Sequence, residues 1–233
     1  MRTRAAALLA LALALSSCAG VPAGPPAAPA AVVGNLFSAI PCAETGLGRT
    51  WARLLPEASV RFPGLKLTMT DDLHVTVVYV GPGWRREDLG RIRPLALVAP
   101  AQPFTSRPAI TRFGATGHVV VAELADAPAA WRAAVGAAKS EMNRLGLKEP
   151  DRYDAEFRPH VTLAASRRRA PVAADAAELD AFRAWLEEKA TAEPASFTVS
   201  LGPETRVRLW LAGLPRPTRA PEYVDLERLP SRR

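Results

Sequence analysis

Two nearly identical tetrapeptides constrain the fold of this chain more than any other feature. One reads HVTV from His74 and the other HVTL from His160, and together they hold two of the three histidines in the sequence. Alternating polar and apolar residues predict strands, in which each histidine shares a face with the threonine two positions later. Because the two copies lie about half a domain apart, we interpret them as an internal duplication whose strands face each other across a groove.

The rest of the chain predicts strands and helices that do not alternate regularly, which is typical of an α+β domain rather than repeated βαβ units. The expected strands are Val32–Ile40, Leu65–Met69, Leu73–Val80, Phe104–Phe113, His118–Leu124, Pro159–Ala165, Phe197–Leu201, Arg206–Leu211 and a short one within Tyr223–Leu229. The expected helices are Glu44–Leu55, Glu87–Val98 with a potential break at Pro94, Ala129–Leu145 and Glu178–Ala190.

The first 31 residues carry targeting signals. Residues 1–17 combine a short basic start with an apolar run, as in a secretory signal peptide, and residues 15–18 (LSSC) resemble a bacterial lipobox. We therefore expect lipidation of Cys18, a Pro/Ala linker over residues 18–31 and a folded domain over residues 32–229. This predicts a bacterial envelope protein, lipid-anchored on the periplasmic side of a membrane; the alternative is an ordinary secretory signal with an incidental cysteine.

Charge and cysteine content add weaker indications. The formal net charge is +7, which favours polyanionic ligands such as nucleotides, RNA or acidic lipid headgroups. A solvated, arginine-rich surface with no such ligand is the alternative. If Cys18 is lipidated, Cys42 has no partner for an intramolecular disulfide, and we interpret it as a small packing residue. Trp131 lies at helical spacing and is expected in the core.

The paired motifs suggest a chemistry. Cleavage of a phosphodiester needs a base to activate the nucleophile and an acid to protonate the leaving oxygen, and two histidines can supply both. Threonine hydroxyls beside them can donate hydrogen bonds to the non-bridging oxygens. No metal ion is required. The alternative is that both His-x-Thr pairs only pack within strands.

The motifs also resemble a known family. Residues 157–163 (FRPHVTL) and 72–81 (DLHVTVVYVG) closely resemble the second and first motifs of the 2H phosphoesterases, which include bacterial 2′-5′ RNA ligase-like proteins and cyclic nucleotide phosphodiesterases. Residues 35–41 (NLFSAIP) are similar to the family's opening strand. The helix expected over 129–145, followed by Gly146, also stands where the family places one. The resemblance spans roughly residues 32–229.

This resemblance implies a bilobal fold, in which two pseudo-symmetric lobes of mixed or antiparallel strands with flanking helices enclose a central cleft. It further implies that His74 and His160 are catalytic and that Thr76 and Thr162 bind the substrate phosphate. Phe37 matches a family aromatic and is expected to contact a base or sugar.

One position departs from the family pattern. Many bacterial members carry an arginine five residues after the second histidine, where this chain has Ala165. Arg167 and its neighbours could replace it or form an exposed basic turn. Arg158 shares strand parity with His160 and is a further candidate substrate contact, although an exposed structural arginine fits equally well. His118 is a weaker candidate.

These observations predict a monomeric, metal-independent phosphoesterase without a cofactor. It would act on a 2′,3′-cyclic phosphate, a 2′-5′ linkage or a related nucleotide or RNA phosphodiester, while its N-terminal lipid binds the membrane. Two alternatives stay open. One is a non-catalytic nucleotide- or RNA-binding envelope lipoprotein, which Ala165 favours, and the other is a structural lipoprotein with accidental His-x-Thr pairs.

Overall fold

A computed structural model describes residues 34–148, 150, 154–168, 170–212 and 223–226. The signal peptide, lipidated cysteine and linker predicted over residues 1–31 lie outside the described residues. In the part of the chain that is described, no helix has the length and apolar character needed to cross a bilayer.

The domain contains both predicted classes of element, in an order that confirms an α+β fold. The strands are β1 (Asn35–Pro41), β2 (Leu65–Leu67), β3 (His74–Gly81), β4 (Phe104–Ser106), β5 (Ala109–Phe113), β6 (Val119–Glu123), β7 (His160–Ser166), β8 (Val199–Leu201), β9 (Arg208–Ala212) and β10 (Tyr223–Asp225). The helices are α1 (Gly46–Arg61), α2 (Leu89–Ala96), α3 (Ala129–Arg144) and α4 (Ala173–Ala192), with 3₁₀ turns at Thr70–Asp72 and Arg86–Asp88.

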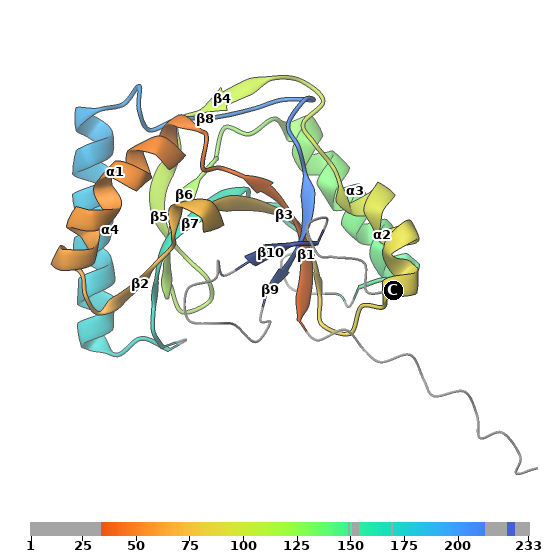
Figure 1. The fold of residues 1–233 in the computed structure, drawn as a ribbon, viewed down its shortest axis with the longest axis horizontal. Coiled ribbons are helices and arrows are strands. Elements are labelled where there is room, and N and C mark those ends of the chain that lie inside the picture. Colours follow the sequence, from red (N-terminus) through yellow and green to blue (C-terminus); the bar gives the residue numbers. More distant parts are fainter. Residues whose placement is uncertain (1–33, 149, 151–153, 169, 213–222, 227–233) are drawn as a thin grey trace, which may run out of the picture. The chain divides into compact units, whose positions relative to one another are not determined.

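The two motif strands lie side by side in the middle of the main sheet (Figure 1). The strand order among the described residues is β10-β9-β1-β3-β7-β6-β5, and the paired neighbours are antiparallel. The short strand β2 pairs with the C-terminal part of β7, beyond the point where β3 begins. Strands β4 and β8 form a separate two-stranded sheet.

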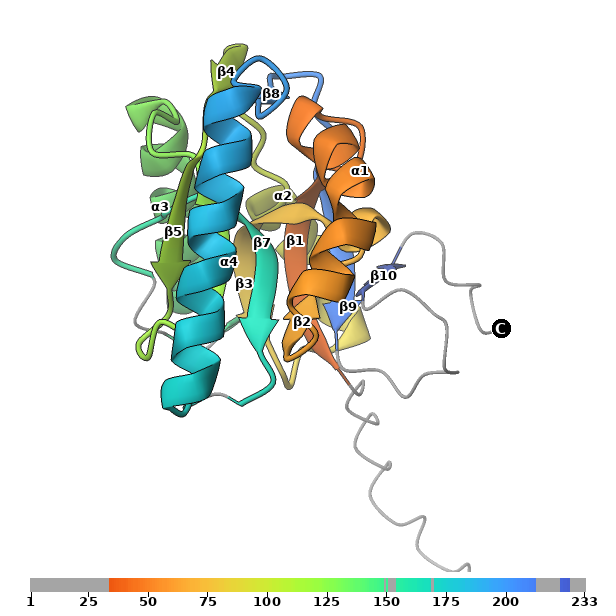
Figure 2. The same cartoon turned by 90° about the vertical axis from the view of Figure 1, so that its left-hand side faces the viewer.

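One face of the main sheet is covered by helices and forms the core. In the motif strands, Val75 and Val161 are fully buried there and belong to the same hydrophobic cluster as Trp51 of α1 and Trp131 of α3. In the view of Figure 1, helices α1 and α4 lie at the left of the domain and helices α2 and α3 at the right. Figure 2 shows α4 running alongside β5 and β7. The prediction that Trp131 is a core residue is confirmed.

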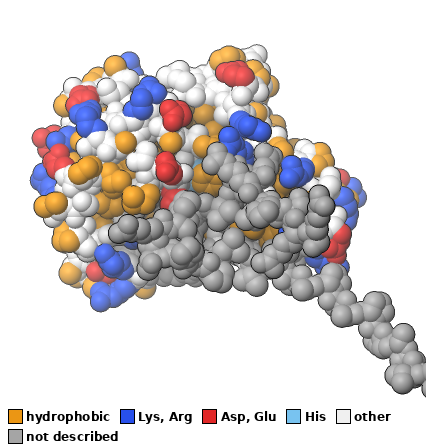
Figure 3. Space-filling view, viewed as in Figure 1, with side chains coloured by type: hydrophobic (Ala, Val, Ile, Leu, Met, Phe, Trp, Pro, Cys, Tyr) orange, Lys and Arg blue, Asp and Glu red, His pale blue; other side chains and the backbone are white. Residues whose placement is uncertain are grey.

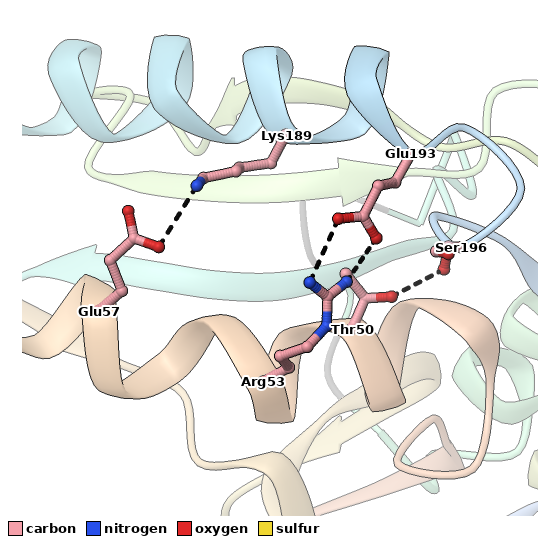
Figure 4. A network of polar contacts seen from close by, with 6 residues as sticks. All are labelled: Thr50, Arg53, Glu57, Lys189, Glu193 and Ser196. Carbon is pink, nitrogen blue, oxygen red and sulfur yellow. Dashed lines mark hydrogen bonds and ion pairs between the residues drawn. The ribbon is translucent and has the colours of Figure 1, made fainter.

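Polar contacts join α1 to α4 and the turn after it (Figure 4). Arg53 forms two hydrogen bonds to the carboxylate of Glu193, and the Nζ atom of Lys189 lies 3.3 Å from a carboxylate oxygen of Glu57. The hydroxyl of Thr50 donates to the carbonyl of Ser196 at 3.1 Å. Exposed ion pairs of this kind contribute little stability each, so the contact between the buried rings of Trp51 on α1 and Phe182 on α4 matters more.

The structure corrects several predicted boundaries. The single strand expected over Phe104–Phe113 is wrong, because it divides at Pro108 into β4 and β5, which pair in different sheets. Proline has no backbone N–H to donate to a ladder and restricts the residue before it. Helix α1 is longer than predicted and continues through Pro56, while α2 extends two residues past Pro94. The residues between β2 and β3 form the 3₁₀ turn at Thr70–Asp72, and these two strands pair with other strands rather than with each other.

Charged side chains are mixed on the face seen in Figure 3. Lys and Arg groups lie beside Asp and Glu groups, and hydrophobic atoms are scattered between them. Over the described part of this face, no continuous field of one sign is visible. The net positive charge of the chain is therefore not concentrated in one patch on this side.

Candidate functional site

The sheet brings both His-x-Thr motifs onto one face. Val75 pairs directly with Val161 across the antiparallel strands β3 and β7. Extended by one residue in each direction, this antiparallel register would place His74 across from Thr162 and Thr76 across from His160. All four side chains are partly exposed, while the valines between them face the core. We call this partly exposed surface of β3 and β7 the motif face.

Both imidazoles are held in the same way. The Nδ1 atom of His74 lies 2.7 Å from the carbonyl oxygen of Asp72, and Nδ1 of His160 lies 2.7 Å from the carbonyl oxygen of Arg158. A carbonyl oxygen can only accept, so Nδ1 carries the hydrogen in each ring. In the neutral imidazole, Nε2 is then the basic nitrogen, and it is directed away from this backbone contact.

Aromatic rings flank each histidine. The ring centroid of His74 lies 5.3 Å from that of Phe37 on β1 and 5.0 Å from that of Trp210 on β9. The ring of His160 lies 4.2 Å from that of Phe113 on β5. Phe37 therefore contacts the catalytic candidate His74 and is itself almost fully buried, at 3% exposed. These rings restrict the orientations that the imidazoles can adopt.

An ion pair lies beside His160. Glu123 on β6 is the direct cross-strand partner of His160, and its carboxylate receives hydrogen bonds of 2.8 and 2.6 Å from the guanidinium of Arg158. Thr111 donates a further bond to this carboxylate at 3.3 Å. The guanidinium also lies 5.2 Å from the ring centroid of Phe113. Arg158 is thus held by Glu123 while 42% of its side chain stays exposed.

The surroundings shift the proton affinities of this group. Hydrogen bonds from Arg158 hold the pKa of the Glu123 carboxyl below its usual value, so it is ionised at neutral pH. Burial lowers the pKa of His160, which the backbone contact and the charge of Glu123 partly offset. His160 therefore tends toward the neutral form while a carboxylate stands beside it.

Other residues selected from the sequence lie away from the motif face. Arg167 follows β7 and donates to the carbonyls of Pro63 and Gly64, at the opposite end of the strand from His160. His118 lies at the start of β6, with Nδ1 3.1 Å from the hydroxyl of Thr116. The structure does not bring either one together with the two motifs.

Two further positions have clear packing environments. Ala165 pairs with Lys66 on β2 and with Val119 on β6, and so has strands on both sides. Cys42 is fully buried, and burial raises its pKa to about 12. A thiol that remains protonated cannot act as a nucleophile near neutral pH. The prediction that Cys42 is a packing residue is confirmed.

Three neighbours of the histidines were not selected from the sequence: Glu123, Phe113 and Trp210. Each comes from a strand distant in sequence from the histidine it contacts. The one available signal was Glu123, a carboxylate that closes the apolar run of β6. Among the described residues, no three His, Cys, Asp or Glu side chains gather in a way that could hold a metal ion.

Comparison with known proteins gives matches at the level of structure. No family model and no curated protein sequence matches the chain. E. coli LigT, crystallised with 3′-AMP, superposes with a TM-score of 0.54 and 17% identity, over 83% of this chain and 95% of LigT. A protein described as a phosphoesterase gives 0.52 and 18%, over 83% and 95% of the two chains. The protein TT0787 of Thermus thermophilus gives 0.51 and 21%, over 82% and 94%. The chain therefore has a LigT-like α+β fold, as predicted.

Proposed function

We propose that this LigT-like chain is a metal-independent phosphoesterase that cleaves nucleotide or RNA phosphodiesters with a 2′,3′-cyclic phosphate or a 2′-5′ linkage. The observation that carries the proposal is the pairing of two His-x-Thr motifs on one face of adjacent strands. In this register, an imidazole and a hydroxyl alternate around one point between β3 and β7. A phosphate group at that point could contact all four side chains.

The mechanism uses one histidine in each protonation state. For a 2′,3′-cyclic phosphate, the neutral imidazole takes a proton through Nε2 from a water molecule as the water oxygen bonds to phosphorus. The protonated imidazole donates its Nε2 proton to the ribose oxygen as that oxygen leaves. Because Nδ1 of each ring is bonded to a carbonyl, both rings direct the same atom to the reaction. The two threonine hydroxyls donate to the non-bridging oxygens, where negative charge grows.

We assign the base to His160 and the acid to His74. Burial lowers the pKa of His160, which favours the neutral form that a base requires. When His160 becomes protonated during the reaction, the ionised carboxylate of Glu123 stabilises its positive charge. Glu123 is therefore a positioning and charge-balancing residue, in the manner of a carboxylate beside a catalytic histidine.

The substrate class is supported by two observations. The formal charge is +7 for the whole chain and +5 after removal of residues 1–17 with Arg2 and Arg4 (28 basic against 23 acidic residues), and a positive charge favours anionic ligands. The structural neighbour LigT has been crystallised with 3′-AMP and with NADP+. Both are nucleotides, and we extend that substrate class to this chain.

Turnover separates this proposal from the non-catalytic alternative. Full-length protein in detergent is incubated with 2′,3′-cyclic nucleotides and 2′-5′-linked dinucleotides, with and without EDTA. We expect cleavage that is insensitive to EDTA. Nucleotide binding without turnover would instead support a binding lipoprotein, and activity lost to EDTA and restored by zinc or manganese would refute the mechanism.

We also propose that Cys18 is lipidated and anchors the domain to a bacterial membrane, on the envelope side. The support is the lipobox-like LSSC at residues 15–18 and the Pro/Ala sequence that follows. One acyl chain anchors weakly, so several chains are expected on the mature protein. Wild-type protein should label with a palmitate analogue and sediment with membranes, and Cys18→Ser should abolish both; unlabelled, fully soluble wild-type protein would refute the anchor.

A further inference from the structure

A groove runs along one edge of the main sheet, between β5 and α4. It has a volume of about 830 Å³, and residues 107–112 form one of its walls, the last four of them in β5. Consecutive residues of a strand point to opposite faces of a sheet. Because residues of both kinds line the cavity, it follows the edge of β5 rather than one face. We call it the edge groove; Figure 2 shows β5 and α4 side by side there.

The wall formed by β5 offers backbone groups to a ligand. Strand β5 stands at the end of the strand order and pairs with β6 alone among the described strands. In an antiparallel pair, alternate residues direct their N–H and C=O groups to the partner strand, and the residues between them direct theirs away from it. Arg107 and Ala109 are exposed, so solvent reaches this wall. An extended peptide satisfies such a row, because it carries the same groups at the same spacing.

Helix α4 forms the opposite wall. Its groove-lining residues recur at helical spacing, so one stripe of the helix faces the groove: Asp180, Arg183, Glu187, Ala190 and Thr191. The buried side chains of Ile110 and Phe197 add apolar surface between the two walls. A peptide added beside β5 would turn every second side chain toward α4, which suits an extended segment better than a compact ligand.

The charges of the edge groove favour an acidic segment. Two of its three arginines already have partners on α4, since Arg112 lies 3.0 Å from a carboxylate oxygen of Asp180 and Arg183 lies 2.6 Å from one of Glu187. The third, Arg107, is exposed and forms no ion pair within the described part of the chain. A carboxylate on the incoming segment would therefore find its partner in Arg107.

The same charges disfavour a second copy of this chain in the groove. Residues 107–113 (RPAITRF) contain two arginines and no carboxylate. Two copies of β5 paired edge to edge would bring these arginines toward each other, and like charges on neighbouring strands are destabilising. Pro108 also lacks the N–H that a symmetric ladder would use.

We propose that the edge groove binds an extended, acidic peptide segment of another protein, which adds a strand to the main sheet beside β5. Backbone hydrogen bonds to β5 hold the segment, and one of its carboxylates pairs with Arg107. The inference does not depend on phosphoesterase activity, because none of the four motif side chains lines the groove.

The test starts from a random peptide library displayed on phage, which is selected on the full-length protein in detergent. Selected peptides are synthesised with a fluorescent label, and anisotropy gives their Kd. Thr191→Trp fills the groove from an exposed position of α4, and Ala184→Trp is its control at an exposed position of the same helix outside the groove. Arg107→Glu reverses the charge at the groove, and Arg85→Glu makes the same change at an exposed position elsewhere.

The selection should enrich acidic peptides. Thr191→Trp should raise their Kd about tenfold or more, and Arg107→Glu about threefold or more, while each control stays within about twofold of wild type. A selection that yields no peptide, or only peptides without acidic residues, contradicts the proposal. So does an equal loss of affinity in a groove variant and its control.

Two further measurements test whether the peptide binds as a strand. Methylating every second backbone nitrogen of a selected peptide gives two complementary versions, and only one of them should lose binding, because one set of N–H groups faces β5. Deuterium exchange within residues 109–113 should slow when the peptide is bound. Equal losses in both methylated versions, or unchanged exchange in β5, would rule out strand addition. A peptide-free dimer in native mass spectrometry that Thr191→Trp disrupts would assign the groove to a second copy and reject the acidic segment.

Discussion

The two halves of the motif face share their backbone chemistry and differ in their neighbours. His74 and His160 each place Nδ1 2.7 Å from the carbonyl oxygen two residues earlier, and each lies against a phenylalanine. Beside His74 stands a second ring, Trp210. Beside His160 stands the ionised carboxylate of Glu123.

This comparison separates what orients a histidine from what sets its proton affinity. The shared carbonyl contact fixes the same tautomer in both rings, so Nε2 is the basic nitrogen in each. The unlike neighbours then give each ring a different electrostatic environment. Two copies of one motif can therefore supply an acid and a base, because the surrounding strands and not the motifs distinguish them.

The largest expected effect tests whether both halves are needed. His74→Ala and His160→Ala should each lower kcat by roughly a hundredfold or more, the typical contribution of general acid–base catalysis. The double variant should lose much less than the product of the single losses, because the two groups act as a unit. Turnover of a 2′,3′-cyclic nucleotide measures this, with circular dichroism as the control for folding. Full activity in either single variant would refute the paired mechanism.

A smaller loss is expected at the hydroxyl groups. Thr76→Val and Thr162→Val keep the shape of each side chain but remove the donor to the phosphate oxygens. Each should cost about 1–3 kcal/mol in transition-state stabilisation, the scale of a hydrogen bond to a charged group. Equal losses would indicate that the halves contact the phosphate symmetrically. If kcat/KM is unchanged in both variants, the threonines do not bind the phosphate.

The aromatic neighbours should have weaker and unequal effects. Phe113→Leu removes the ring against His160 and also the ring beneath Arg158, whereas Phe37→Leu leaves Trp210 against His74. An aromatic contact contributes about 0.5–1.5 kcal/mol beyond its buried area, so the first variant should lose roughly two- to tenfold in kcat and the second less. The measurement is kcat for both variants, and the test is which variant loses more. The melting temperatures of the two variants should be similar, so that the loss does not reflect unfolding. A larger loss for Phe37→Leu would contradict the comparison.

Local signals predicted much of the fold. Helix α3 was expected over Ala129–Leu145 and is found over Ala129–Arg144. The prediction was close because the apolar spacing of this segment is clear and because Gly146 adopts the left-handed conformation, φ +66°, that ends many helices. The strand break at Pro108 was missed because residues on both sides continue a strand-like pattern. The pairing of β2 with β7 was not predictable, since nothing in a three-residue strand identifies a partner about a hundred residues away.

The residues of the candidate site also fall into those that local sequence could predict and those that depend on distant strands. The two histidines and two threonines were predicted because each pair is adjacent on one strand. Glu123 and Phe113 reach His160 only through the register of β5, β6 and β7, which depends on distant segments. Arg167, chosen because it lies near the motif in sequence, is carried past the end of β7 instead.

The smallest effect gives the sharpest test of how the halves differ. The groups facing His160 include Glu123 on β6 and Arg158 before β7; the first raises and the second lowers the pKa of the imidazole. If His160 is the base, its pKa sets the acidic limb of the bell-shaped profile of kcat/KM on 2′,3′-cyclic AMP. Glu123→Gln should lower that pKa and move the limb to lower pH, while Arg158→Gln should move it to higher pH, each by roughly half a unit or more. If the two variants instead move the basic limb, Glu123→Gln to lower pH and Arg158→Gln to higher pH, then His160 is the acid. If both variants move a limb in the same direction, or neither moves one, the ion pair does not set the difference in pKa between His160 and His74.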